Sequence, residues 1–250
     1  MEGFLNRLMK IKIEVGSLNH NASEEQKTKP NSRPFSREIY AILQKGQPKY
    51  LQGTLEIGHK IFTLGTDLKR MKMSWRVLSK LEELNELMSP IDQAEGKKLI
   101  WALKPAMLAL IQPKFLEEPC EGVTLPVAAC LSNIMKLTAP IAPYNDDVMR
   151  RITRLIVDTF QDLDNSTGST FGKKLEILWC MATFKTYVIM FDLECDDLIL
   201  QMFRCFFSIR RHHPDIVIAH MQSILSSCMR DHETIGQELQ TRLLSIWRRE

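Results

Sequence analysis

Three groups of residues in this 250-residue sequence carry side chains that could do chemistry. The first is the run Gly-Ser-Thr-Phe-Gly-Lys-Lys at 168–174, which has the look of a phosphate-binding loop. It has one residue too few between its glycines, it lacks the Ser or Thr that should follow the lysine, and no predicted strand precedes it. We therefore interpret the run as a loop followed by the basic start of a helix.

The second and third groups are histidines and carboxylates near predicted helix ends. His212 and His213 are adjacent and point in different directions, whereas a catalytic metal site needs two histidines one helical turn apart and a third ligand. The acidic run at 192–197 could do acid–base work, but acidic residues in the first turn of a helix explain it without chemistry. No group joins a nucleophile, a base and an orienting residue. The sequence therefore predicts no enzyme, no cofactor and no metal.

Composition excludes several other classes. The formal charge is +3, from 33 basic and 30 acidic residues, and the basic residues are not clustered, so we expect no direct nucleic-acid contact. The six cysteines include no Cys-x-x-Cys pair, which favours reduced thiols in a cytosolic or nuclear protein. Lysines interrupt the most apolar stretches, and the N-terminus has no continuous apolar region, so we expect a soluble intracellular protein without a membrane span.

The helices that would position these groups follow an N-terminal stretch with a different pattern. Residues 20–36 are polar and are expected to be flexible, and glycines at 46, 53, 58 and 65 should keep any element short. We therefore expect a poorly ordered or short-helix N-terminal extension over residues 1–72. Helical repeats of the HEAT type should occupy residues 73–250.

From Trp75 onward, apolar residues recur with the 3.6-residue period of amphipathic helices. Asn145 can cap one of these helices, and Pro105 is expected to bend or split another. The expected helices span 75–88, 96–111, 124–138, 145–163, 173–191, 195–209, 214–229 and 235–247.

Paired helices that recur about every 40 residues are typical of HEAT or armadillo-like solenoids, in which each pair packs only against its neighbours. No stretch alternates with a period of two, so a sheet is not expected. A closed bundle of the same helices would show the same periodicity. We predict an all-α fold, a short HEAT/armadillo-like solenoid.

The segment Leu-Thr-Ala-Pro-Ile-Ala-Pro-Tyr at 137–144 is unusual because it places two prolines three positions apart. Pro140 and Pro143 prevent the helix from continuing and favour extended geometry. A rigid turn that ends in Tyr144 could expose carbonyls and a hydroxyl to a partner peptide. On physical grounds alone, a stiff connector is the favoured interpretation.

The run Val-Ala-Ala-Cys-Leu-Ser-Asn-Ile-Met-Lys-Leu-Thr-Ala-Pro-Ile-Ala-Pro-Tyr-Asn-Asp-Asp at 127–147 resembles the plant branch of the precocious-dissociation-of-sisters family. These proteins are cohesin-associated HEAT-repeat regulators of sister-chromatid cohesion. The likeness covers roughly residues 80–244 and includes Asp-Leu-Glu-Cys-Asp at 192–196. It implies a nuclear, chromatin-associated and non-catalytic regulator of cohesin, acting in mitotic cohesion and in DNA repair by homologous recombination.

The resemblance also implies partners and a site. In the family the motif usually reads Ala-Pro-acid-Ala-Pro-aromatic, and its neighbourhood receives short peptides from cohesin factors such as Wapl. Here Ile141 replaces the acid. The expected partners are the cohesin complex and its Wapl-type release factor, whereas the helical pattern alone would equally suit a HEAT-repeat adaptor in transport or signalling. The residues implied to bind the partner are Ala139, Pro140, Ala142, Pro143 and Tyr144.

Overall fold

The computed structural model describes residues 34–36, 39, 41–42, 52–117, 122–161, 163, 166–209 and 214–230, all of which belong to the unit Pro34–Glu250. Among these residues the structure is helical, joined by turns and by an isolated bridge between Phe35 and Tyr144. The predicted all-α fold is confirmed. Its helices are α3 (Gln52–Arg70), α4 (Trp75–Met88), α5 (Gln93–Leu110), α6 (Pro113–Leu116), α7 (Thr124–Thr138), α8 (Asp146–Asp158), α9 (Phe171–Phe184), α10 (Val188–Asp192), α11 (Asp196–Ile209) and α12 (Asp215–Arg230).

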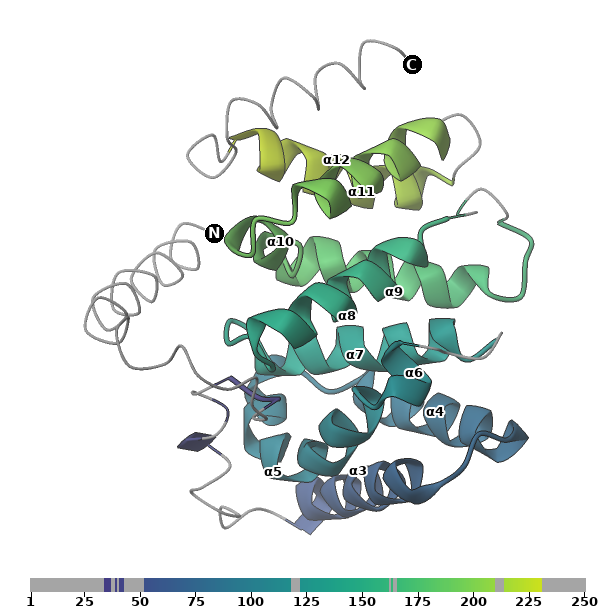
Figure 1. Cartoon of the computed structure of the whole chain (residues 1–250), viewed down its shortest axis with the longest axis vertical. Coiled ribbons are helices and arrows are strands. Elements are labelled where there is room, and N and C mark those ends of the chain that lie inside the picture. The colour runs from purple at the N-terminus through teal and green to yellow at the C-terminus, as the bar shows by residue number, and fades with distance from the viewer. Residues whose placement is uncertain are drawn as a thin grey trace. The chain divides into compact units, whose positions relative to one another are not determined.

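The described helices stack in two layers (Figure 1). In one layer α3 packs on α5, α5 on α7, α7 on α9, and α9 on α12. In the other, α4 packs against α3 and α7, while α8 packs against α7 and α11. Each helix therefore buries its apolar face against its neighbours in the stack, as expected for a helical-repeat array. Within the described ranges, none of the helices combines the length and the apolar character that a membrane-spanning helix needs.

Six hydrogen bonds between elements of the stack join residues that are 43 positions apart in the sequence. This recurring separation lies within the range of HEAT and armadillo repeats. It arises because equivalent helices of successive repeats lie side by side, which distinguishes the stack from a closed bundle of the same helices. The pairs are Lys69 with Gln112, Met71 with Lys114, Gln93 with Lys136, Asn133 with Glu176, Arg154 with Asp197, and Asp158 with Gln201.

Most of the predicted helices from residue 75 onward occur with small shifts at their ends. Helix α5 begins at Gln93 because the Asp92 side chain accepts a 2.8 Å hydrogen bond from the Glu95 N–H. Pro105 lies inside α5 and does not split it. Helix α8 is shorter than predicted and ends at Asp158, with Phe160 buried in the following turn. The predicted helix at 235–247 lies outside the described residues.

The predicted helix at 173–191 is interrupted, because α9 ends at Phe184 and the next residue, Lys185, is left-handed with φ of 53°. Helix α9 contacts α7 and α12, whereas α10 contacts α8 and α11. One straight helix could not reach both sets of neighbours, which explains why the apolar pattern continues across the break. Tyr187, between the two helices, and Met190 on α10 are both buried.

Helix α3 corrects the prediction for residues 1–72. It is a continuous 19-residue helix that contains Gly58 and Gly65, so the glycines do not keep it short. At Gly65 the backbones of α3 and α5 come so close that a Cβ atom would lie 2.3 Å from the Ala106 nitrogen. The glycine allows two helices to pack closely, and the helical array therefore begins before residue 73. The expected flexibility of residues 20–33 lies outside the described residues.

The close approach at Gly65 predicts a large effect of one methyl group. Gly65→Ala should destabilise the protein by about 1–3 kcal/mol, because the new Cβ would push the backbone of α5 away from α3. Gly172→Ala is the matched control, since a Cβ at that exposed helical position meets nothing within 4 Å. The control should be neutral or stabilising by up to about 1 kcal/mol. Urea denaturation of both variants checks this, and equal stability would contradict the packing at Gly65.

Candidate partner-binding site

The run at 168–174 has no arrangement for holding a phosphate. Its glycines lie in a turn and at the start of α9, with α8 rather than a strand before it. Lys173 forms an ion pair with Glu82 of α4, and Lys174 Nζ donates a 2.7 Å hydrogen bond to the Gln161 carbonyl. The interpretation as a loop and a basic helix start is confirmed.

Neither the acidic run nor His220 belongs to a metal centre among the described residues. Asp197 lies in the first turn of α11 and pairs with Arg154 at 3.1 Å. No group of three His, Cys, Asp or Glu residues in the described part of the chain could hold a metal ion. His212 and His213 lie outside the described residues, and burial lowers the pKa of His220.

The proline turn, defined here as residues 139–144, is held at both ends by hydrogen bonds. Thr138 is the last residue of α7, and its carbonyl accepts a 3.0 Å hydrogen bond from the Ile141 N–H. At the other end, the Asn145 side chain accepts a 3.0 Å hydrogen bond from Val148 N–H and caps α8, as the sequence predicts. The turn is therefore a stiff connection between two packed helices.

The turn buries its aromatic end. Tyr144 is 1% exposed, and its hydroxyl donates a 3.1 Å hydrogen bond to the Met107 carbonyl on α5. Burial raises the pKa of Tyr144 well above its ordinary value. The expectation that this hydroxyl faces a partner is therefore wrong, because it satisfies a buried carbonyl instead. Pro143 is also buried, whereas residues 140–142 are half-buried and form the accessible part of the turn.

A segment from the N-terminal region lies against this turn and was missed by the sequence analysis. Phe35 forms an antiparallel bridge with Tyr144, and the Asn145 N–H donates a 3.0 Å hydrogen bond to the Pro34 carbonyl. The predicted flexibility of 20–36 is therefore wrong for residues 34–36. The spacing of Phe35, Ile39 and Ile42 by four and three positions is a signal that could have indicated an apolar helical face.

The buried hydroxyl of Tyr144 allows a test of whether this group stabilises the fold or contacts a partner. Tyr144→Phe keeps the ring but leaves the Met107 carbonyl without this donor, so we expect a loss of about 1 kcal/mol in unfolding free energy. Chemical denaturation would measure the loss. If the hydroxyl instead served a partner, stability would be unchanged and only partner affinity would fall.

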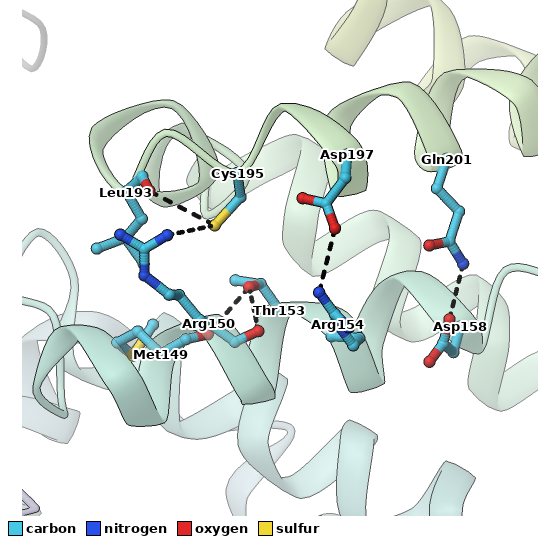
Figure 2. Close-up of polar contacts among 9 residues, drawn as sticks. All are labelled: Met149, Arg150, Thr153, Arg154, Asp158, Leu193, Cys195, Asp197 and Gln201. Atoms are coloured by element: carbon cyan, nitrogen blue, oxygen red, sulfur yellow. Dashed lines mark hydrogen bonds and ion pairs between the residues drawn. The ribbon is translucent and has the colours of Figure 1, made fainter.

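The exposed side of α8 forms polar contacts with the next repeat (Figure 2). Arg154 pairs with Asp197, and Gln201 Nε2 donates a 2.7 Å hydrogen bond to Asp158. Arg150 points toward the buried Cys195, with 3.6 Å between Nη1 and Sγ. Exposed pairs of this kind stabilise by about 0–1 kcal/mol each. They link α8 to α11 and leave these arginines engaged within the chain.

The interior of the stack contains a polar cluster made by α4, α7 and α9. Asn133 on α7 is 1% exposed, and its side-chain amide donates to Asn85 at 3.0 Å and to Glu176 at 3.4 Å. Asn85 donates a second 3.4 Å hydrogen bond to the same carboxylate. The carboxylate therefore accepts from residues of two other helices, which fixes the relative position of all three.

Lys136, one turn further along α7, is buried at 2% exposure. Its ammonium donates to the Met88 carbonyl at 3.3 Å and to the Ser89 carbonyl at 2.7 Å, at the C-terminal end of α4. A cation suits the negative end of a helix. Desolvation nevertheless lowers the pKa of Lys136, and the neighbouring Cys180 and Glu176 only partly oppose it.

This lowered pKa predicts a pH dependence of stability. The unfolded chain binds more protons than the folded one between the folded pKa of Lys136 and its ordinary value of 10.5, so stability should rise with pH in that window. Lys136→Met removes this contribution. Wild type should therefore gain stability relative to the variant as pH rises from 7 to about 10, as measured by urea denaturation. Lys97→Met, at an exposed position, controls for net charge, and a constant difference for Lys136→Met would contradict the argument.

A family model and several individual relatives of this chain all point to the same protein family. The model of the family described as "Sister chromatid cohesion protein PDS5 protein" matches residues 76–246. Sister chromatid cohesion protein PDS5 homolog A of Arabidopsis thaliana is 36% identical over 170 residues, which cover 68% of this chain and 11% of that protein. PDS5 homolog A of Homo sapiens is 31% identical over 210 residues, which cover 83% of this chain and 15% of that protein. The chain thus spans only a small part of these relatives.

A solved structure shares the fold. A chain from "Structure of the Pds5-Scc1 complex and implications for cohesin function" superposes with a TM-score of 0.53 and 23% sequence identity. The match covers 62% of this chain and 24% of that one. At this level of identity, the likeness supports the helical-repeat fold alone.

Proposed function

We propose that this chain, which belongs to the PDS5 family of sister chromatid cohesion proteins, is a non-catalytic scaffold that regulates cohesin. Its role would lie in sister-chromatid cohesion during mitosis and in DNA repair by homologous recombination, in the nucleus and on chromatin. The observation that carries the proposal is the family match over residues 76–246. The described residues add a stack of helices that offers surface for partners, and among them Lys173, Lys174 and Asp197 form contacts within the chain.

The proposed partners are the cohesin complex and a Wapl-type release factor. The solved relative is a complex of Pds5 with Scc1, which supports a cohesin subunit as one partner. The matched region is 11% of the Arabidopsis thaliana homolog A and 15% of the human one, so the proposal concerns what this portion of the array contributes. Neither direct nucleic-acid binding nor membrane association is part of it.

The proposed peptide-binding residues remain Ala139, Pro140, Ala142, Pro143 and Tyr144, but their environments assign them different roles. Residues 140–142 are half-buried and can contact a peptide, whereas the buried Pro143 and Tyr144 would hold the turn in shape. Ile141 packs partly against the apolar core and offers no charge to a basic peptide residue. Recognition here would therefore rest on shape and apolar contact.

Purification from nuclear extract tests the general proposal. The tagged full chain should retain cohesin subunits, identified by mass spectrometry. Recovery of transport receptors or of kinase and phosphatase components, without cohesin, would favour the alternative of a general HEAT-repeat adaptor.

A change at the accessible part of the turn tests the site. Ala142→Arg should weaken binding of a Wapl-type peptide by about 2 kcal/mol, the size expected at a binding hot spot, because it adds bulk where the peptide would lie. The melting temperature should change little. The control is Ile216→Ser, at a 54% exposed position on α12, and it should leave affinity unchanged.

A second variant tests whether an acidic residue at position 141, in place of Ile141, strengthens peptide binding. Ile141→Asp should tighten binding of a peptide with a basic residue at the facing position, and the gain should shrink as salt concentration rises. Calorimetric titration measures these affinities. Equal values for wild type, Ala142→Arg and Ile141→Asp would remove the turn from the proposed site.

A further inference from the structure

Residues 34–36, called here the strap, contact the proline turn as an extended peptide contacts a receptor. The strap pairs its backbone with the turn through the bridge between Phe35 and Tyr144 and the 3.0 Å hydrogen bond from Asn145 N–H to the Pro34 carbonyl. Addition of an extended segment to exposed backbone groups is a recurring mode of peptide recognition. The strap and the turn are about a hundred residues apart in sequence, so their contact is a docking event between distant segments.

The strap also brings an aromatic anchor. The Phe35 ring lies 5.9 Å from the Tyr144 ring, centroid to centroid, with 33° between the ring planes. Phe35 is 4% exposed, so the contact with the turn and its surroundings covers nearly the whole side chain. An aromatic anchor in a pocket, with main-chain hydrogen bonds beside it, supplies both affinity and register.

The strap ends where the chain turns. Ser36 Oγ accepts a 3.3 Å hydrogen bond from the Ile39 N–H, and Ile39 is fully buried. The extended part that contacts Tyr144 and Asn145 is therefore short. Two anchors hold it: Phe35 on the turn, and Ile39 beyond it. Loss of the first would release the strap from the turn while Ile39 could keep the rest of the segment in place.

We propose that the strap is an internal ligand of the proline turn at its Tyr144 end, and that a partner peptide which presents an aromatic residue on an extended backbone competes with it by extending from residues 140–142 to that end. This inference rests on the proposed docking of peptides at the turn, and it names the chemistry of the ligand and a control over access. A tethered ligand has an effective concentration of about millimolar, so it competes strongly with a dilute partner. The apparent affinity for the partner equals the intrinsic affinity multiplied by the fraction of molecules in which the strap is released.

The test uses the strap's own sequence as a probe. A fluorescently labelled peptide with the sequence of residues 30–40 is titrated with the full chain carrying wild-type Phe35, Phe35→Ala or Phe35→Leu. Fluorescence anisotropy should show binding at least about tenfold tighter to the Phe35→Ala chain than to wild type, because the internal competitor is weakened. Phe35→Leu keeps most of the apolar volume, so it provides a folded variant if Phe35→Ala unfolds. It should give a gain in probe affinity between those of wild type and Phe35→Ala.

Two controls locate the effect. A probe with alanine in place of its own phenylalanine should not bind any chain. Phe62→Ala changes a 42% exposed phenylalanine on α3 and should leave probe affinity at the wild-type value. Circular dichroism confirms that each chain is folded at the temperature of the titration.

The outcomes separate this inference from the proposed function. Equal probe affinity for wild type and both Phe35 variants would overturn the strap as a competitor, and so would absence of probe binding to every folded chain. In either case the docking of a Wapl-type peptide is judged independently by Ala142→Arg. If Ala142→Arg has no effect on that peptide while the Phe35 variants bind the probe more tightly, the internal contact stands and the partner assignment fails.

Discussion

The structure depends on the burial of helix α7 along nearly its whole length. Its residues from Pro126 to Thr138 are all buried, polar ones included, so each polar side chain there must find a partner inside the protein. Asn133 and Lys136 do so on α4 and α9. These bonds require that α4 ends near Lys136 and that Glu176 reaches inward from α9. A single buried helix thus sets the register of the repeats on both sides of it.

The sequence predicted helices best where one face of the helix is apolar and the opposite face is polar. Helix α8 combines an Asn145 cap, two acidic first-turn residues and a periodic apolar face, and all three appear in the structure. Helix α3 was missed because its glycines were interpreted as helix breakers. The same residue type serves close helix packing when another backbone lies against it, and that neighbour is 41 positions away from Gly65, at Ala106. The residues that neighbour Gly65 in the sequence therefore give no sign of that contact.

The proline turn was recognisable from the sequence, but the direction of Tyr144 was not. Two prolines predict a stiff turn whatever surrounds it, whereas the place of an aromatic side chain depends on what its hydroxyl can reach. Here it reaches a carbonyl of α5 that precedes it by 37 residues. The strap was missed for a similar reason, because Pro34 and Phe35 follow a polar segment and their partners Tyr144 and Asn145 lie far along the sequence.

The two interpretations of the proline turn, as a stiff connector and as a docking surface, therefore describe different residues of the same segment. Pro143 and Tyr144 are buried, and Tyr144 links the turn to α5 and to the strap, so we expect changes at these residues to lower stability. Residues 140–142 are held in place by those inner residues and remain half-accessible. A rigid surface loses little conformational entropy when it binds a peptide. The stiffness of the connector is thus what would make residues 140–142 a useful docking surface. Replacing Pro143 or Tyr144 would disorder that surface, so it would not test whether a peptide binds there.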